Sequence, residues 1–198
     1  MCLGIIIKKS GILIIGYFIS GLGGGFLLTI YTKETQTVEI LNAREVAPKL
    51  ATSNMYVNNS LASITGGLAI AVPGELKGLW ALHQKYGKLK WRDLIQPNID
   101  LCRNGHIVSP YLVKIFSGSE QRLLDEPSLR EIFINPKTNK TWQLGQKVKR
   151  EQLAKSLEII AIEGADAIYN NGSLAKNLVD DIRKFGGIIT EEDLLDYR

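Results

Sequence analysis

Residues 21–48 read GLGGGFLLTIYTKETQTVEILNAREVAP, and this stretch decides the local fold. Its first five residues include four glycines and predict a bend, because glycine adopts positive φ and allows close backbone approach at little cost. Residues 26–31 and 37–42 are apolar, β-branched or aromatic and flank a polar connection, which predicts an antiparallel hairpin. Pro48 ends the second arm, since proline has no amide to donate to a strand ladder.

Arg44 comes directly after the second predicted arm, where a strand end can hold a fixed cation. A guanidinium presents two parallel N–H donors that match a carboxylate, and such a charged contact contributes roughly 1.5 to 3 kcal/mol. Taken by itself, a surface or structural arginine is the more common case. Glu45 is predicted to be structural and to hold Arg44 in place. The glycine spacing does not fit a nucleotide-binding loop, because a strand follows where a helix should begin.

Two motifs in sequence order carry a resemblance to a known family. The Gly-x-Gly-Gly-Gly bend followed by Asn42-Ala43-Arg44-Glu45-x-Ala47-Pro48 resembles the heavy chain of gamma-glutamyltransferases, also called glutathione hydrolases. Further stretches resemble the same heavy chain, namely residues 69–75, Trp91 with 94–97, 161–165, 169–173 and 186–194. The resemblance covers residues 21–198, which are therefore expected to be a partial heavy-chain domain.

The resemblance implies a fold and a reaction. The implied fold is the αββα sandwich of N-terminal nucleophile hydrolases, of which this chain would hold an incomplete, helix-rich part. The implied reaction cleaves the γ-glutamyl bond of glutathione and related compounds through a γ-glutamyl-enzyme, with transfer to water or to amino acids and peptides. Arg44 is implied to bind the α-carboxylate of the γ-glutamyl group. No cofactor is implied.

The implied nucleophile is a threonine in an Asp-Gly-Gly-Thr type motif, and that tetrapeptide does not occur in this sequence. No catalytic residue is therefore assigned here, and a light chain of the same precursor is expected to supply the threonine. The chain by itself is expected to be inactive. The alternative is a truncated, catalytically inactive homologue that acts as a secreted or membrane-attached binding protein.

Composition and charge exclude several other classes of protein. Apolar residues make up 45% of the 198 residues and charged residues 22%, which fits one globular domain. The net charge is +4, and the basic residues are scattered rather than arranged as a nucleic-acid-binding stripe. Cys2 and Cys102 do not make a disulfide framework. His83 and His106 lack neighbours at metal-ligand spacing, so no metal site is predicted.

Asn58, Asn139 and Asn171 begin three Asn-x-Ser/Thr tripeptides and are candidate glycosylation sites. Chance supplies one or two such tripeptides in a chain of this length. Because the resemblance implies an extracellular enzyme, the three together are taken as support for a secretory route. The expected location is the extracellular face of the plasma membrane or the secreted fraction.

Residues 1–20 form a divergent hydrophobic segment. Lys8 and Lys9 precede the apolar residues 11–20, a pattern typical of a signal sequence or a membrane anchor. The apolar run reaches the length of a membrane span only by absorbing the glycine bend, so a buried helix or strand is the structural alternative. A mispredicted start of the chain is a further alternative.

The remaining sequence predicts one more strand and then mostly helices, which is the pattern of an α+β or layered α/β class. The strand is expected at residues 68–72. Helices are expected from residue 76 to Gly87, over 91–104 with either a kink or the start of a second piece at Pro97, over 109–124, around 153–160 and after a Ser173 cap. Residues 126–142 are expected to be irregular. Thr190 and Asp193 have the outline of a capping box.

Overall fold

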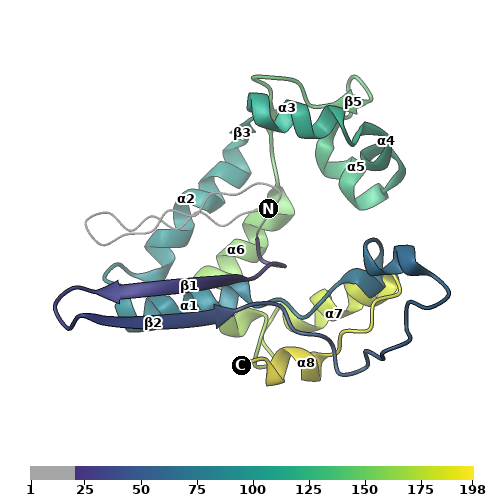
Figure 1. Ribbon diagram of the computed structural model, residues 1–198. Helices are drawn as coiled ribbons and strands as arrows, with labels where there is room; N and C mark the ends of the chain where they lie inside the picture. Colours follow the sequence, from purple (N-terminus) through teal and green to yellow (C-terminus); the bar gives the residue numbers. More distant parts are fainter. Residues whose placement is uncertain (1–20) are drawn as a thin grey trace. The chain divides into compact units, whose positions relative to one another are not determined.

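The computed structural model describes residues 21–198 and divides into two units. The first unit holds residues 21–94 together with Ile159–Arg198, and the second holds Ile95–Glu158. The predictions for residues 1–20, including Cys2, lie outside the described residues. Figure 1 labels most of the helices and strands of both units.

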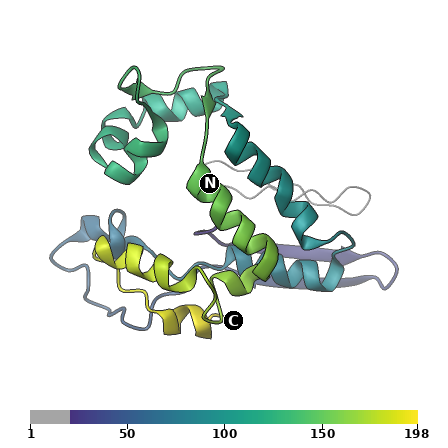
Figure 2. The same ribbon diagram turned by 180° about the vertical axis from the view of Figure 1, so that it is seen from behind.

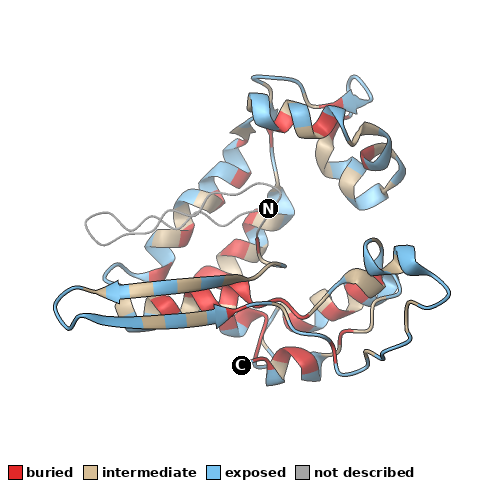
Figure 3. Ribbon diagram, in the orientation of Figure 1, coloured by how far each residue is buried: buried red, intermediate tan, exposed pale blue. Residues whose placement is uncertain are grey.

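The predicted hairpin is confirmed in the first unit. Strand β1 (Phe26–Thr32) pairs antiparallel with β2 (Thr37–Ala43), in a register that runs from Phe26 opposite Ala43 to Thr32 opposite Thr37. One face of the hairpin is exposed, and the other packs on α1 (Glu75–Tyr86), whose buried residues are red beside the hairpin in Figure 3. Alternating side chains of a half-buried strand pair produce this two-sided pattern.

Helix α1 matches its prediction and ends immediately before Gly87. Helix α2 (Trp91–Asn104) also has the predicted bounds, but Pro97 lies within one continuous helix and does not begin a second piece. Trp91 anchors the start of α2, because its indole Nε1 donates a hydrogen bond of 2.9 Å to the Ile160 carbonyl. None of the helices within residues 21–198 has both the length and the apolar character needed to cross a bilayer.

The predicted strand at residues 68–72 is wrong. Residues 60–69 form two short 3-10 helices, η1 (Ser60–Ser63) and η2 (Gly67–Ala69), and only Val72 makes a β-bridge, with Val46. Local turn bonds explain the difference, since the amides of Ala69 and Ile70 donate to the Gly66 and Gly67 carbonyls, each at 3.2 Å. Pro73 then removes the next donor that a ladder would need.

The C-terminal part of the first unit is helical. Helix α6 (Glu151–Glu163) begins in the second unit and ends in the first, where η3 (Gly164–Ala167), α7 (Ala175–Lys184) and α8 (Glu191–Asp196) follow it. The Ser173 cap is wrong, because the Ser173 hydroxyl donates to Glu163 and the α7 N-cap is Leu174. The Thr190–Asp193 capping box is confirmed. Figure 2 shows α7 and α8 beside the segment that follows β2.

The second unit is built from short elements. Strand β3 (His106–Ile107) pairs with β6 (Lys147–Val148), and β4 (Ile134–Asn135) pairs with β5 (Lys140–Thr141). The helix predicted over 109–124 is instead two helices, α3 (Pro110–Ser117) and α4 (Glu120–Asp125), broken at Gly118.

Residues 126–142 are more regular than predicted. Helix α5 (Pro127–Phe133) begins with its proline in the first turn, where a missing amide costs nothing, and the Glu126 carboxylate accepts from the Ser128 amide. The β4–β5 pair follows it. Phe116 is buried in this unit, and its ring centroid lies 5.6 Å from that of Phe133.

Candidate functional site

Arg44 follows the last residue of β2, and its backbone is held on both sides. Its amide donates to the Asn42 side-chain oxygen at 3.1 Å, and its carbonyl accepts from the Tyr197 hydroxyl at 2.8 Å. Its side chain is 59% exposed. The residue chosen from the sequence is therefore a solvent-accessible cation on a fixed backbone at the end of a strand.

Glu45 lies beside the Arg44 guanidinium, as predicted. Arg44 Nε lies 3.3 Å from Glu45 Oε2, and the Glu45 side chain is 25% exposed. Within residues 21–198 this ion pair is the one polar contact of the Arg44 side chain. It occupies the Nε edge, so the two terminal nitrogens remain available to a carboxylate in a bidentate arrangement.

The glycine bend packs against the beginning of α1 and against Arg44. The Gly24 carbonyl accepts from the amides of Gly74 and Glu75, at 3.0 and 2.9 Å, and the Gly21 amide donates to the Glu75 carboxylate at 3.0 Å. A Cβ on Gly25 would lie 2.5 Å from the Ala43 carbonyl oxygen, so only glycine allows this approach. The bend thus fixes the strand end that carries Arg44.

Residues 44–49, here called the Arg44 segment, are also attached to α8. The Lys49 amide donates to Asp193 at 2.8 Å, and the Lys49 ammonium reaches Glu192 at 2.7 Å and also Asp196. Burial by itself raises the pKa of Asp193, but hydrogen bonds from Lys49 and Thr190 outweigh burial, so that the pKa lies below its ordinary value. Asp193 is therefore an ionised acceptor that joins the helix cap to this segment.

Two buried tyrosines lie beneath the Arg44 segment. Tyr197 is 4% exposed, and its ring packs on that of Tyr169 at a centroid distance of 5.7 Å. The Tyr169 hydroxyl donates to the Pro73 carbonyl at 2.7 Å. Burial raises the pKa of both phenols. Neither tyrosine, nor Glu75, is identified as part of the site by sequence reasoning, because their partners are remote in sequence.

The remaining titratable residues make no second site. The His83 ring nitrogen lies 2.8 Å from the Leu89 carbonyl and its ring packs on Trp91, while burial lowers the pKa of His106. Cys102 is a buried free thiol whose pKa is raised by burial. The described part of the chain contains no group of three or more His, Cys, Asp or Glu side chains able to hold a metal ion.

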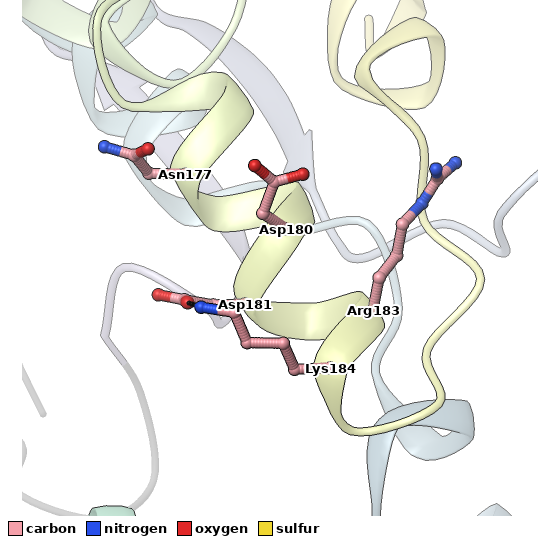
Figure 4. Close-up of a pocket in the computed structure, with 5 residues that line it drawn as sticks. All are labelled: Asn177, Asp180, Asp181, Arg183 and Lys184. Carbon is pink, nitrogen blue, oxygen red and sulfur yellow. Dashed lines mark hydrogen bonds and ion pairs between the residues drawn. The ribbon is translucent and has the colours of Figure 1, made fainter.

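An open depression lies on α7, away from these contacts. Its lining residues all come from that one helix, as Figure 4 shows: Asn177, Asp180, Asp181, Arg183 and Lys184. Asp180 pairs with Lys176 at 2.5 Å and Asp181 pairs with Lys184 at 2.7 Å. The charges neutralise one another within the helix, so this depression is an ordinary solvated helix surface.

The three sequon asparagines lie in exposed turns. Asn58 ends a run of turn residues before η1, Asn139 is in the β4–β5 connection, and Asn171 follows η3. Asn139 accepts a hydrogen bond of 3.0 Å from Arg130. All three positions are accessible on the surface.

Comparison with known proteins identifies the family. The gamma-glutamyltranspeptidase family model matches residues 11–198, so the match begins within the segment that the sequence motifs leave out. Scoloptoxin SSD14 of Scolopendra dehaani is 39% identical over 198 residues, which are 100% of this chain and 33% of that protein. Glutathione hydrolase 5 proenzyme of Rattus norvegicus is 39% identical over 181 residues, 90% of this chain and 31% of that protein.

A solved structure agrees with these relatives. The gamma-glutamyltranspeptidase of Helicobacter pylori superposes with a TM-score of 0.83 at 33% identity, over 90% of this chain and 52% of that one. The chain spans about a third of the length of the curated relatives given above. Its fold is a partial, helix-rich α/β part of the N-terminal nucleophile hydrolase architecture. The chain belongs to the gamma-glutamyltranspeptidase family, a family of enzymes.

Proposed function

We propose that this chain is the heavy-chain portion of a gamma-glutamyltransferase, or glutathione hydrolase, and that Arg44 binds the α-carboxylate of the γ-glutamyl donor. The observation that carries the proposal is the exposure of the Arg44 guanidinium and the single edge at which it is paired. It is mostly exposed, it stands on a backbone held by Asn42 and Tyr197, and the one ion pair that it makes within residues 21–198, with Glu45, engages Nε. The terminal nitrogens can then grip both oxygens of a carboxylate.

In the proposed reaction this chain orients the substrate and the light chain performs the bond chemistry. A threonine hydroxyl outside this chain attacks the γ-carbonyl while its own amine accepts the proton. The amine of the donor leaves with a proton, and a γ-glutamyl ester remains on the threonine. Water or the amine of an amino acid or peptide then attacks that ester and regenerates the hydroxyl. Arg44 fixes the amino-acid end of the donor so that the γ-carbonyl meets the nucleophile.

The test is a substitution of Arg44 in the full-length precursor. Arg44→Ala should raise KM for γ-glutamyl-p-nitroanilide by about tenfold or more, the factor that corresponds to loss of one charge-assisted contact. Arg44→Lys should also raise KM, because an ammonium cannot reproduce the planar fork. The matched control is Arg103→Ala, which removes another half-exposed arginine paired with a glutamate, here Glu158. Equal KM values for wild type and Arg44→Ala would remove Arg44 from the site.

The proposed dependence on a light chain has a separate test. The 198-residue chain alone should release no p-nitroaniline from the same donor, whereas the precursor should release it after self-cleavage. A reading frame that continues from Arg198 to an Asp-Gly-Gly-Thr type site favours the enzyme. A stop codon directly after Arg198 favours the alternative, an inactive secreted or membrane-attached binding protein.

The proposed location is extracellular, either secreted or at the plasma membrane surface. What supports it is the family together with the exposed turn positions of Asn58, Asn139 and Asn171. If glycans are attached there, treatment with a glycan-removing amidase should increase gel mobility of the protein expressed in a eukaryotic secretory host. Asn→Gln at each site should remove one step of that mobility change. A wild-type protein with unchanged mobility would contradict the secretory assignment.

A further inference from the structure

We propose that Tyr197 is a positioning residue for Arg44, an inference that rests on the proposed function. The Tyr197 hydroxyl donates to the Arg44 carbonyl at 2.8 Å across 153 residues of sequence. It touches neither the guanidinium nor any atom that would react. It therefore acts on substrate binding only through the place in which it holds the Arg44 backbone.

Tyr197 is itself held in one position. It is 4% exposed and packs on the Tyr169 ring, and a Cβ on Gly74 would lie only 2.0 Å from its hydroxyl oxygen. The glycine at position 74 thus leaves the space through which the hydroxyl reaches Arg44. A buried, packed aromatic ring loses little freedom when its hydroxyl forms a bond, which makes it a rigid support.

Tyr197 and Asp193 hold opposite ends of the Arg44 segment from the same part of the chain. Tyr197 directly follows α8 and bonds the first residue of the segment, while Asp193, inside α8, bonds the amide of its last residue, Lys49. The segment is therefore held at both ends, in addition to the bridge that Val46 makes with Val72 in its middle. Burial raises the pKa of Tyr197, so its hydroxyl remains a protonated donor throughout the neutral and mildly alkaline range.

Removal of the hydroxyl should lower the affinity for the donor without altering the chemical step. The Arg44 carbonyl would lose its tyrosine donor, and the guanidinium would then sample more positions. Binding of a carboxylate would then have to order this more mobile guanidinium. The conformational freedom that the guanidinium loses would lower the affinity for the donor. This effect is on the docking of the donor, so it should appear in KM and not in kcat.

The experiment measures kcat and KM for γ-glutamyl-p-nitroanilide with the Tyr197→Phe precursor. KM should rise about threefold to tenfold, the factor that corresponds to one neutral hydrogen bond, while kcat changes by less than about twofold. The matched control is Tyr56→Phe, since the Tyr56 hydroxyl also donates to a carbonyl, that of Leu68, at 2.8 Å. Tyr56→Phe should leave both constants unchanged, and thermal unfolding of both variants shows that they are folded.

The double variant Arg44→Ala/Tyr197→Phe separates this inference from the proposed function. If Tyr197 acts through Arg44, the second substitution should add no KM change to the first, because coupled residues are not additive. Three outcomes overturn the inference. In the first, Tyr197→Phe raises KM by the same factor in the Arg44→Ala background as in the wild type. In the second, Tyr197→Phe has the same KM as Tyr56→Phe, and in the third it lowers only kcat. An unchanged KM in Arg44→Ala alone overturns instead the assignment of Arg44 as the carboxylate-binding residue.

Discussion

The two units differ in how far along the sequence their side-chain hydrogen bonds reach. In the first unit, the bond from Tyr197 to Arg44 spans 153 residues and that from Lys49 to Asp193 spans 144. In the second, the bond from the Trp142 indole to the Ile132 carbonyl spans 10. The surface pair of Arg103 and Glu158, which spans 55, is a longer connection there.

The difference shows that long-range hydrogen bonds are concentrated at the Arg44 segment. Segments remote in sequence meet at the Arg44 segment, so a change near the end of the chain is transmitted to the strand end that carries the proposed carboxylate-binding residue. The second unit combines short-range contacts with the β3–β6 pair and a small apolar core around Phe116.

The largest effect is expected for Phe116→Ala in the second unit. The ring is 1% exposed and lies against Phe133, so its removal leaves a cavity and should cost about 3 to 5 kcal/mol of unfolding free energy. KM for the γ-glutamyl donor should stay within about twofold of wild type where the protein is still folded. Chemical denaturation and steady-state kinetics on the same preparation check both statements. A large KM increase in folded protein would contradict the functional separation of the units.

The next effect is expected for Gly74→Ala in the first unit. The added Cβ would lie 2.0 Å from the Tyr197 hydroxyl and 2.5 Å from the Ala43 carbonyl, so both must move. Unfolding free energy should fall by about 2 to 3 kcal/mol, as for an overpacked core. KM for the donor should rise as well, unlike in Phe116→Ala, because the displaced groups support Arg44. Destabilisation with an unchanged KM would show that the site tolerates movement of Tyr197.

The sequence predicts the local features of the site better than its long-range support. The hairpin, the strand-end position of Arg44 and the Thr190–Asp193 capping box follow from residues a few positions apart, and the structure confirms them. The roles of Tyr197 and Glu75 could not be predicted, because their partners lie 153 and 54 residues away.

The errors in secondary structure come from local bonding that overrides composition and periodicity. The apolar residues 68–72 have the composition of a strand, but the amides of Ala69 and Ile70 close a 3-10 turn on the Gly66 and Gly67 carbonyls, and Val72 makes only a single bridge, with Val46. Within the second unit the error is local: the run from 109 to 124 has helical periodicity, but Gly118 ends the first helix and Ser119 precedes the next.

A smaller effect, with a defined pH dependence, is expected for Asp193→Asn. Asp193 is 5% exposed and accepts from the amides of Lys49 and Thr190, so the neutral amide should cost about 1.5 kcal/mol. Because the folded pKa lies below the unfolded one, the unfolded state binds more protons in acid. The stabilisation is therefore present above the unfolded value, near 3.8, and is lost as pH falls through the folded value.

Thermal unfolding of wild type and Asp193→Asn between pH 7 and pH 3 provides the measurement. The gap between their melting temperatures should be largest near neutral pH and should shrink below pH 4. The matched control is Asp181→Asn, an exposed carboxylate paired with Lys184 on α7, which should change the melting temperature little. A gap that widens in acid would show that the Asp193 carboxyl is stabilised in its protonated form.

The smallest effect, opposite in sign, is expected for Gly118→Ala in the second unit. Gly118 has φ −77° and ψ −7°, which alanine adopts without strain, and an added Cβ would come no closer than 3.7 Å to another atom. The substitution should stabilise the protein by about 0.4 to 1 kcal/mol, because alanine has less freedom to lose on folding. Denaturant midpoints of Gly118→Ala and Gly74→Ala, measured together, should therefore move in opposite directions. A destabilised Gly118→Ala would contradict this prediction. It would show that alanine does not fit the break between α3 and α4, although its backbone conformation is one that alanine ordinarily adopts.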